Sequence, residues 1–162
     1  GLKRGGGWAG ESMAYPGHSQ HLVFPKGSCM PQTPEPKAPE GTISLRVMAM
    51  PKDANAEGNI FGGWVLSQMD MAGALHAYSH TNTRLATVAV DGMKFHKPVN
   101  VGDEVTCYTR IVRIGRTSIS ILIETWVRTP RNTVPQHVTS GTFVYVALDE
   151  AGQPIEIKNR TY

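Results

Sequence analysis

A single apolar stretch, residues 61–78, limits the folds open to this chain more than any other feature of its sequence. It is long enough for about five helical turns. Apolar residues occur on all sides of the helical wheel, which is typical of a helix that other parts of the protein cover. One carboxylate, Asp70, nevertheless stands among them. An acid in such a run has few routes to water, so Asp70 needs either a hydrogen-bond partner or a function.

Five stretches with the alternation of half-buried strands accompany this helix: one precedes it, four follow it, and no second helix is predicted. Gly115 permits a tight reversal between two of them, where we expect an antiparallel hairpin. The pattern predicts an α+β fold in which one curved antiparallel five-stranded sheet wraps one long central helix. The five stretches are 42–50, 85–95, 104–114, 117–128 and 137–148.

Composition and charge narrow the class of protein. A chain of 162 residues suits one domain. The formal charge is only +3, and several cations lie in the first 40 residues, so we expect no nucleic-acid partner. Two cysteines make a poor disulfide framework and favour a reducing compartment, so we expect a cytoplasmic protein. No stretch approaches the roughly 18 consecutive apolar residues of a membrane-spanning helix, which predicts no membrane partner.

The two ends of the chain differ from its middle. Residues 1–40 are rich in Gly, Pro, Ser, His and Lys without a hydrophobic period, so we predict a disordered N-terminal extension. Met30 directly precedes a proline-rich run, and we interpret it as a candidate natural start. A single domain is expected over residues 41–155, followed by a C-terminal tail over 156–162.

Three motifs, together with this order of elements, carry a family resemblance. The helix motif AEGNIFGGWVLSQMDMAG spans residues 56–73, TVAVDGMKFHKPVNVGD spans 87–103, and VRIGRTSI spans 112–119. They resemble the hotdog-fold acyl-CoA thioesterases, and among these the bacterial YciA-like acyl-CoA hydrolases. The resemblance covers roughly residues 42–150.

The resemblance implies hydrolysis of acyl-CoA thioesters to free fatty acid and CoA, with no cofactor. It implies an active site between the two subunits of a homodimer, and dimers that commonly assemble further into a hexamer, a trimer of dimers. Asp70 matches the position of the family's catalytic acid. Asn59 matches an asparagine that cooperates with that acid from the partner subunit.

The residues themselves fit this chemistry. Asp70 is a candidate general base for water, or a nucleophile that forms a mixed anhydride; the sequence leaves both open. Gly62 and Gly63 place bare backbone N–H groups at the helix start, where one of them could bind the oxyanion. Either glycine could instead simply permit the turn. Asn59 could orient water or donate to the oxyanion, or it could cap the helix.

A second group of residues could hold the CoA moiety. Arg116 follows the hairpin glycine, with Thr117 and Ser118 beside it, and a guanidinium with hydroxyls suits phosphates. Arg113 and Lys97 could add to this basic surface. The alternative is that all these cations are ordinary solvated residues on strands and turns.

Other chemistries find less support. No metal site is predicted, because the histidines form no ligand-spaced cluster; they are His18, His21, His76, His80, His96 and His137. A hotdog dehydratase or hydratase would need a histidine beside the acid, yet His76 points roughly opposite Asp70 on the helical wheel. A non-catalytic acyl-CoA-binding or regulatory module stays an alternative, which an assay of thiol release would separate from an enzyme.

Overall fold

The computed structural model describes residues 38–158. The predicted N-terminal extension, the candidate start at Met30 and the residues after Lys158 lie outside this description, so these expectations stay predictions. Within residues 38–158, no helix combines the length and the apolar character needed to cross a bilayer. Cys107 is a free, buried thiol.

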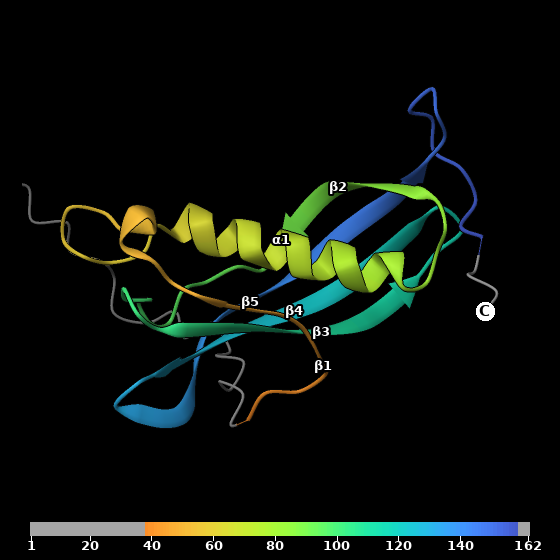
Figure 1. The fold of residues 1–162 in the computed structure, drawn as a ribbon. Helices are drawn as coiled ribbons and strands as arrows, with labels where there is room; N and C mark the ends of the chain where they lie inside the picture. Colours follow the sequence, from red (N-terminus) through yellow and green to blue (C-terminus); the bar gives the residue numbers. More distant parts are fainter. Residues whose placement is uncertain (1–37, 159–162) are drawn as a thin grey trace, which may run out of the picture. The chain divides into compact units, whose positions relative to one another are not determined.

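One long helix and one sheet make up the described part of the chain (Figure 1). Neighbouring strands pair antiparallel in the order β1-β3-β4-β5-β2, so β1 and β2 are the sheet edges. The predicted layout of one helix with five antiparallel strands is confirmed. The elements are β1 (Thr42–Met48), the short 3₁₀ helix η1 (Pro51–Asp53), α1 (Gly62–Tyr78), β2 (Arg84–Asp91), β3 (Glu104–Ile114), β4 (Ser118–Thr129) and β5 (Asn132–Leu148).

Two strand boundaries differ from the prediction by more than two residues. Strand β5 begins at Asn132, five residues before the predicted 137, and Thr129 pairs with Asn132 where β4 turns into it. Residues 132–136 are not predicted as strand because they include Pro135, and proline cannot donate a hydrogen bond to a neighbouring strand. Strand β2 ends at Asp91 and not at Phe95. The next residue, Gly92, has a φ of 76°, which turns the chain away from the sheet.

The core lies between one face of the sheet and one face of α1. Ile119, Ile121 and Ile123 of β4 are fully buried, as the alternation predicts. Val65 and Met69 of α1 are at most 1% exposed. Burying branched side chains of this size contributes roughly 1.5–3 kcal/mol each before entropy is subtracted. This interface therefore fixes the helix on the sheet.

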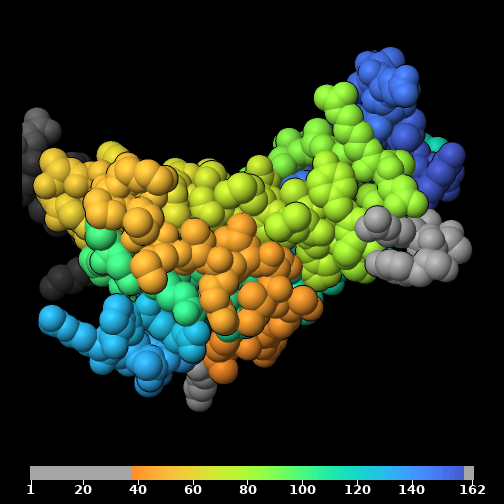
Figure 2. All heavy atoms as spheres, viewed as in Figure 1, coloured from red at the N-terminus to blue at the C-terminus, as the bar shows by residue number. Residues whose placement is uncertain are grey.

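The opposite side of α1 is open in a single protomer, which corrects the expectation that the sheet covers most of the helix. Leu66, Met71 and Leu75 are 38%, 46% and 57% exposed. Figure 2 shows this side of α1 at the surface, bordered by β1. A helix that is apolar on all sides indicates burial on all sides. The sheet of this chain covers only the side of α1 opposite to Leu66, Met71 and Leu75.

One close contact sets the position of α1 on β5. Gly73 is buried, and a Cβ atom there would lie 2.7 Å from Cδ1 of Ile123 and still closer to the hydroxyl of Tyr145. That hydroxyl donates a hydrogen bond to the backbone oxygen of Asp70, with an O···O distance of 3.0 Å. Only glycine at position 73 lets the helix approach Tyr145 this closely.

We predict that Gly73→Ala destabilises the protein, although alanine favours helices by about 1 kcal/mol over glycine. The added methyl group overpacks the contact with Tyr145, which typically costs about 1–3 kcal/mol. Chemical denaturation at fixed protein concentration measures the change. Gly63→Ala is the matched control, because no described residue beyond its neighbours in the helix lies within 4 Å of where its Cβ would stand. A Gly73→Ala protein as stable as the parent would contradict the proposed contact.

Candidate active site

Asp70 lies half-buried near the middle of α1, where two neighbouring strands hold it. Oγ1 of Thr87 in β2 donates to Oδ1 of Asp70 at 2.6 Å. Tyr145 in β5 donates to the backbone oxygen of Asp70. Thr87 and Tyr145 are direct partners in the β2–β5 register, so their side chains leave the same sheet face.

This arrangement leaves the carboxylate without a cation partner within the described residues. Besides the bond from Thr87, the carboxylate of Asp70 interacts with the hydroxyl of Tyr145, and no other residue between 38 and 158 donates to it. Burial, and next the negative charge of Asp70, raise the pKa of Tyr145 above its usual value. The tyrosine therefore stays protonated and remains a donor. One carboxylate oxygen is fixed, and the other can accept a proton or attack.

A stripe of small residues at helical spacing, Gly63, Ser67, Ala74 and Ala77, runs along α1 on the side of Asp70. Gly63 and Ser67 are exposed, Ala74 is half-buried, and only Ala77 is fully buried. Apart from its neighbours in the helix, no part of the described chain lies within 4 Å of where a Cβ on Gly63 would stand. A ligand or another chain can therefore approach this side of the helix closely.

The helix start has free amides and no side-chain cap. Phe61 is the N-cap residue and makes no side-chain capping hydrogen bond, so the interpretation of Asn59 as a helix cap is wrong. Gly62 and Gly63 are the first helical residues, and their N–H groups have no acceptor within the described residues. Such amides favour an anion or an oxyanion.

The loop before the helix contains a second asparagine that sequence reasoning missed. Oδ1 of Asn55 accepts hydrogen bonds from the amides of Glu57 and Asn59, both at 3.0 Å. The backbone N–H of Asn55 donates to the oxygen of Asn59 at 2.7 Å. With Oδ1 held twice, the NH₂ group of Asn55 is oriented, and no described residue accepts from it. Asparagine in a turn-rich segment commonly bonds the backbone two residues ahead, which is the signal that could have singled it out.

A cleft of about 350 Å³ opens beside the helix start. The ring of Phe95 forms one wall, 3.4 Å from where a Cβ on Gly62 would lie. Nζ of Lys97 is held there by Oε1 of Gln136 at 3.2 Å. The volume is typical of a small-ligand site. The lining residues are Ile60, Gly62, Val65, Phe95, His96, Lys97, Pro98 and Val99.

Within one protomer, Asp70 and the helix-start amides do not meet. Asp70 follows Gly62 by eight residue steps along the helix, which correspond to about 12 Å along the axis. A carbonyl group within hydrogen-bond reach of one is therefore out of reach of the other. Asn59, which precedes the helix, lies farther still from Asp70 along the chain.

The predicted CoA-binding residues are also divided between two ends of the sheet. Arg116 is exposed in the β3–β4 turn, next to Ser118, where β4 begins. Lys97 bonds Gln136, which pairs with Val127 near the other end of β4. The nine residue steps from Ser118 to Val127 span about 30 Å of strand. Arg113 is exposed, and Thr117 and Ser118 are half-buried, on the Arg116 side.

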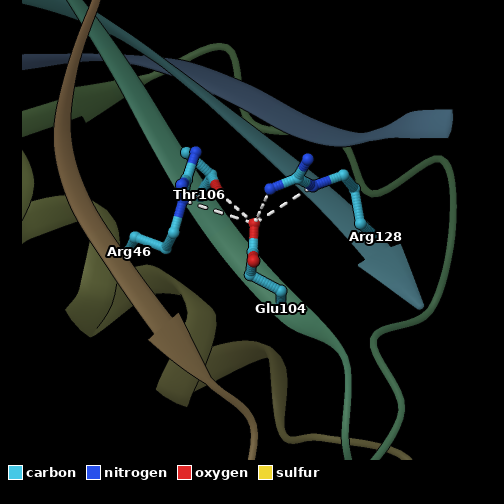
Figure 3. A network of polar contacts seen from close by, with 4 residues as sticks. All are labelled: Arg46, Glu104, Thr106 and Arg128. Atoms are coloured by element: carbon cyan, nitrogen blue, oxygen red, sulfur yellow. Dashed lines mark hydrogen bonds and ion pairs between the residues drawn. The ribbon is translucent and has the colours of Figure 1, made fainter. Parts of the chain in front are cut away.

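A charged network in the structure lies apart from this site. Glu104 at the start of β3 accepts hydrogen bonds from Nε of Arg128 at 3.1 Å, and it pairs with Arg46 at 3.3 Å (Figure 3). The hydrogen bond from Arg128 is the main reason why the pKa of Glu104 is lowered. Glu104 alternates with buried Val105, so the network lies on the sheet face away from α1. It ties β1, β3 and β4 together.

His76, the histidine within α1, contacts β3 and not Asp70. Nδ1 of His76 lies 2.6 Å from Oγ1 of Thr109 in β3, and burial lowers its pKa. His76 therefore lies away from Asp70, as predicted. A dehydratase would need a histidine beside the acid. No group of three His, Cys, Asp or Glu residues within 38–158 could hold a metal ion.

Comparisons with known proteins agree with this geometry. Residues 57–134 match the thioesterase superfamily. The acyl-CoA thioester hydrolase YciA of Salmonella typhimurium is 50% identical over 119 residues, which cover 72% of this chain and 90% of that protein. This chain belongs to the YciA-like acyl-CoA thioester hydrolases. The membership confirms the predicted enzyme class.

Solved structures extend the likeness to the fold. HI0827, a hexameric broad-specificity acyl-coenzyme A thioesterase, superposes with a TM-score of 0.71 at 43% identity, over 75% of this chain and 84% of that chain. It has also been solved with an aspartate replaced by alanine. Cj0915 of Campylobacter jejuni, a hexameric hotdog-fold thioesterase, gives 0.67 at 40% identity, over 73% of this chain and 91% of that chain. The predicted hotdog fold is confirmed.

We predict that Thr87→Val lowers kcat about 10- to 100-fold, because a hydrogen bond to a charged group contributes about 1.5–3 kcal/mol. Thr87 is exposed, so the free energy of unfolding should change little. Steady-state hydrolysis of one acyl-CoA measures kcat. Thr87→Ser keeps the hydroxyl and should retain most of the rate; a Thr87→Val enzyme at the parent rate would show that the contact with Asp70 is not needed.

Proposed function

We propose that this YciA-like hydrolase cleaves acyl-CoA thioesters with Asp70 as its reactive group. The observation that carries the proposal is the positioned carboxylate: Thr87 holds Oδ1, the hydroxyl of Tyr145 lies close by, and no cation within the described residues pairs with the acid. Asp70 also lies beside the open stripe of small residues on α1. A thioester carbonyl can approach the acid there without displacing a side chain.

Two routes use the same carboxylate oxygen. As a general base, Oδ2 takes a proton from water while the water oxygen attacks the carbonyl carbon. The C–S bond then breaks, and the CoA thiolate leaves and is protonated. As a nucleophile, Oδ2 attacks the carbon itself, expels the thiolate and forms a mixed anhydride that water hydrolyses. Thr87 orients the carboxylate in both routes.

The oxyanion donor in this proposal comes from a second copy of the chain. The helix-start amides of one protomer lie about 12 Å from its own Asp70. In a two-fold dimer, each helix start can lie beside the Asp70 of the other copy, which completes two equal sites. Asn59 and Asn55 would arrive with the same loop and could orient the attacking water. HI0827 and Cj0915 are hexamers, and we propose a trimer of such dimers here.

The proposal assigns the phosphates of CoA to the turn that carries Arg116, Thr117 and Ser118. A guanidinium and two hydroxyls suit a multiply charged phosphate group. Arg113 adds a cation on the same side, whereas Lys97 lies at the opposite end of the sheet. Lys97 could therefore contact CoA only where two copies meet.

We predict that Asp70→Asn lowers kcat by about 10²–10⁴-fold, the range of a lost general base. Folding should be intact, because the carboxamide oxygen can still accept from Thr87. Thiol release from acyl-CoA gives the rate, and a thermal melt gives the stability. Glu40→Gln, an exposed acid before β1, is the control for charge. Unchanged thiol release in Asp70→Asn would contradict the role of Asp70.

Gly62→Pro tests the oxyanion donor without disturbing the helix. Proline suits the first helical position, and Phe61 already has the φ of −59° and ψ of 134° that a residue before proline prefers. The substitution deletes one N–H, and we predict a loss of about 10²–10³ in kcat. Gly62→Ala keeps the N–H and should be far more active. Parent-level kcat in Gly62→Pro would exclude the amide of Gly62 from this role.

A further inference from the structure

The chain reverses after β5 and returns along the sheet. We call residues 149–158 the return segment. The N–H of Asp149 donates to the oxygen of Gln153 at 2.9 Å, and the side chain of Asp149 accepts from the N–H of Gln153 at 2.8 Å. Gly152, with a φ of 78°, makes the turn, and Leu148 then bridges to Pro154. The return segment is thus a short hairpin arm on β5.

This arm ends against the turn that carries Arg116. The N–H of Ile155 donates to the oxygen of Ala147 at 2.9 Å. Two residues on, the N–H of Ile157 donates to the backbone oxygen of Arg116 at 2.8 Å. The half-buried side chain of Ile157 packs against the hydrophobic core. The arm is therefore anchored by both its backbone and a side chain.

The Arg116 turn is consequently held on both sides. The oxygen of Thr117 accepts from the N–H of Ala147 in β5 at 2.8 Å. Inside the turn, the N–H of Gly115 donates to the oxygen of Ser118 at 2.7 Å. The side chain of Arg116 is exposed, and the described residues form no ion pair with it. Three hydrogen bonds thus fix the backbone of this turn, while the guanidinium of Arg116 is exposed to solvent.

We propose that the return segment positions Arg116 for the nucleotide phosphates of CoA, with Ile157 as its positioning residue. A ligand that binds a pre-arranged loop does not have to order that loop, and so binds more tightly. The inference rests on the proposed role of Arg116. It adds a function to residues that the sequence identifies only as the end of the domain and the start of a tail.

The test compares two substrates that share one acyl group: acyl-CoA and acyl-pantetheine, which lacks the nucleotide phosphates. Ile157→Pro removes the N–H that bonds Arg116, while Ile157→Val keeps both the N–H and a branched side chain. We expect Ile157→Pro to raise KM for acyl-CoA about fivefold, which corresponds to one ordinary hydrogen bond. Its kcat, and its KM for acyl-pantetheine, should match the parent enzyme. Ile157→Val should match the parent with both substrates.

The outcomes separate the two proposals. Arg116→Ala, measured alongside, should raise KM for acyl-CoA about tenfold or more. If Arg116→Ala leaves KM unchanged, Arg116 does not bind the phosphates of CoA, and the inference fails as well. If Arg116→Ala raises KM but a folded Ile157→Pro does not, the inference alone is overturned. A loss of kcat with both substrates would also overturn it, because the arm would then support the whole fold. Should Ile157→Pro not fold, Ile157→Ala replaces it, with a smaller rise in KM expected for acyl-CoA alone.

Discussion

The contact of α1 with Tyr145 determines where everything else in the site lies. Gly73 lets the helix come down onto the tyrosine, and the tyrosine hydroxyl then bonds the backbone of Asp70. Thr87 pairs with Tyr145 across the β2–β5 register, so it lies beside the tyrosine on the sheet. Its hydroxyl can therefore donate to the carboxylate of Asp70. A helix placed one residue higher or lower on the sheet would break both hydrogen bonds.

The same packing is the reason why the proposed site needs a second copy of the chain. A straight helix keeps its N-terminal amides and its central acid about 12 Å apart, and no side-chain movement changes that distance. The side of α1 away from the sheet is apolar and open, with Leu66, Met71 and Leu75 exposed. An open apolar face beside half of a site is typical of a protein that works as an oligomer.

Much of the architecture could be predicted from the sequence, because periodicity reports directly on the burial of each face. The bounds of α1 and the alternation of Ile119, Ile121 and Ile123 are examples. Contacts between elements could not be predicted in this way. The hydrogen bond of Thr87 to Asp70 depends on the β2–β5 register and on the bulge between Thr87 and Ala89, which no local pattern encodes.

The remaining differences have equally specific causes. The hydrogen bonds to Asn55 arise from a turn, and Asn59 drew attention only because a family motif singled it out. The wide separation of Arg116 from Lys97 follows from the length of β4, which the sequence predicts, combined with the strand order, which it does not. The return segment shows no periodicity, so its attachment to Arg116 became visible only in the structure.

The central claim is that Asp70 of one copy works with the helix start of another, and co-expression of two defective chains tests it most directly. Asp70→Ala and Gly62→Pro subunits, each inactive alone, are combined in mixed oligomers with distinct purification tags. A shared site regenerates one intact site in each mixed dimer, so random mixing should restore about a quarter of the parent activity. Mixed oligomers as inactive as their parents would contradict the account, because both groups would then act within one chain.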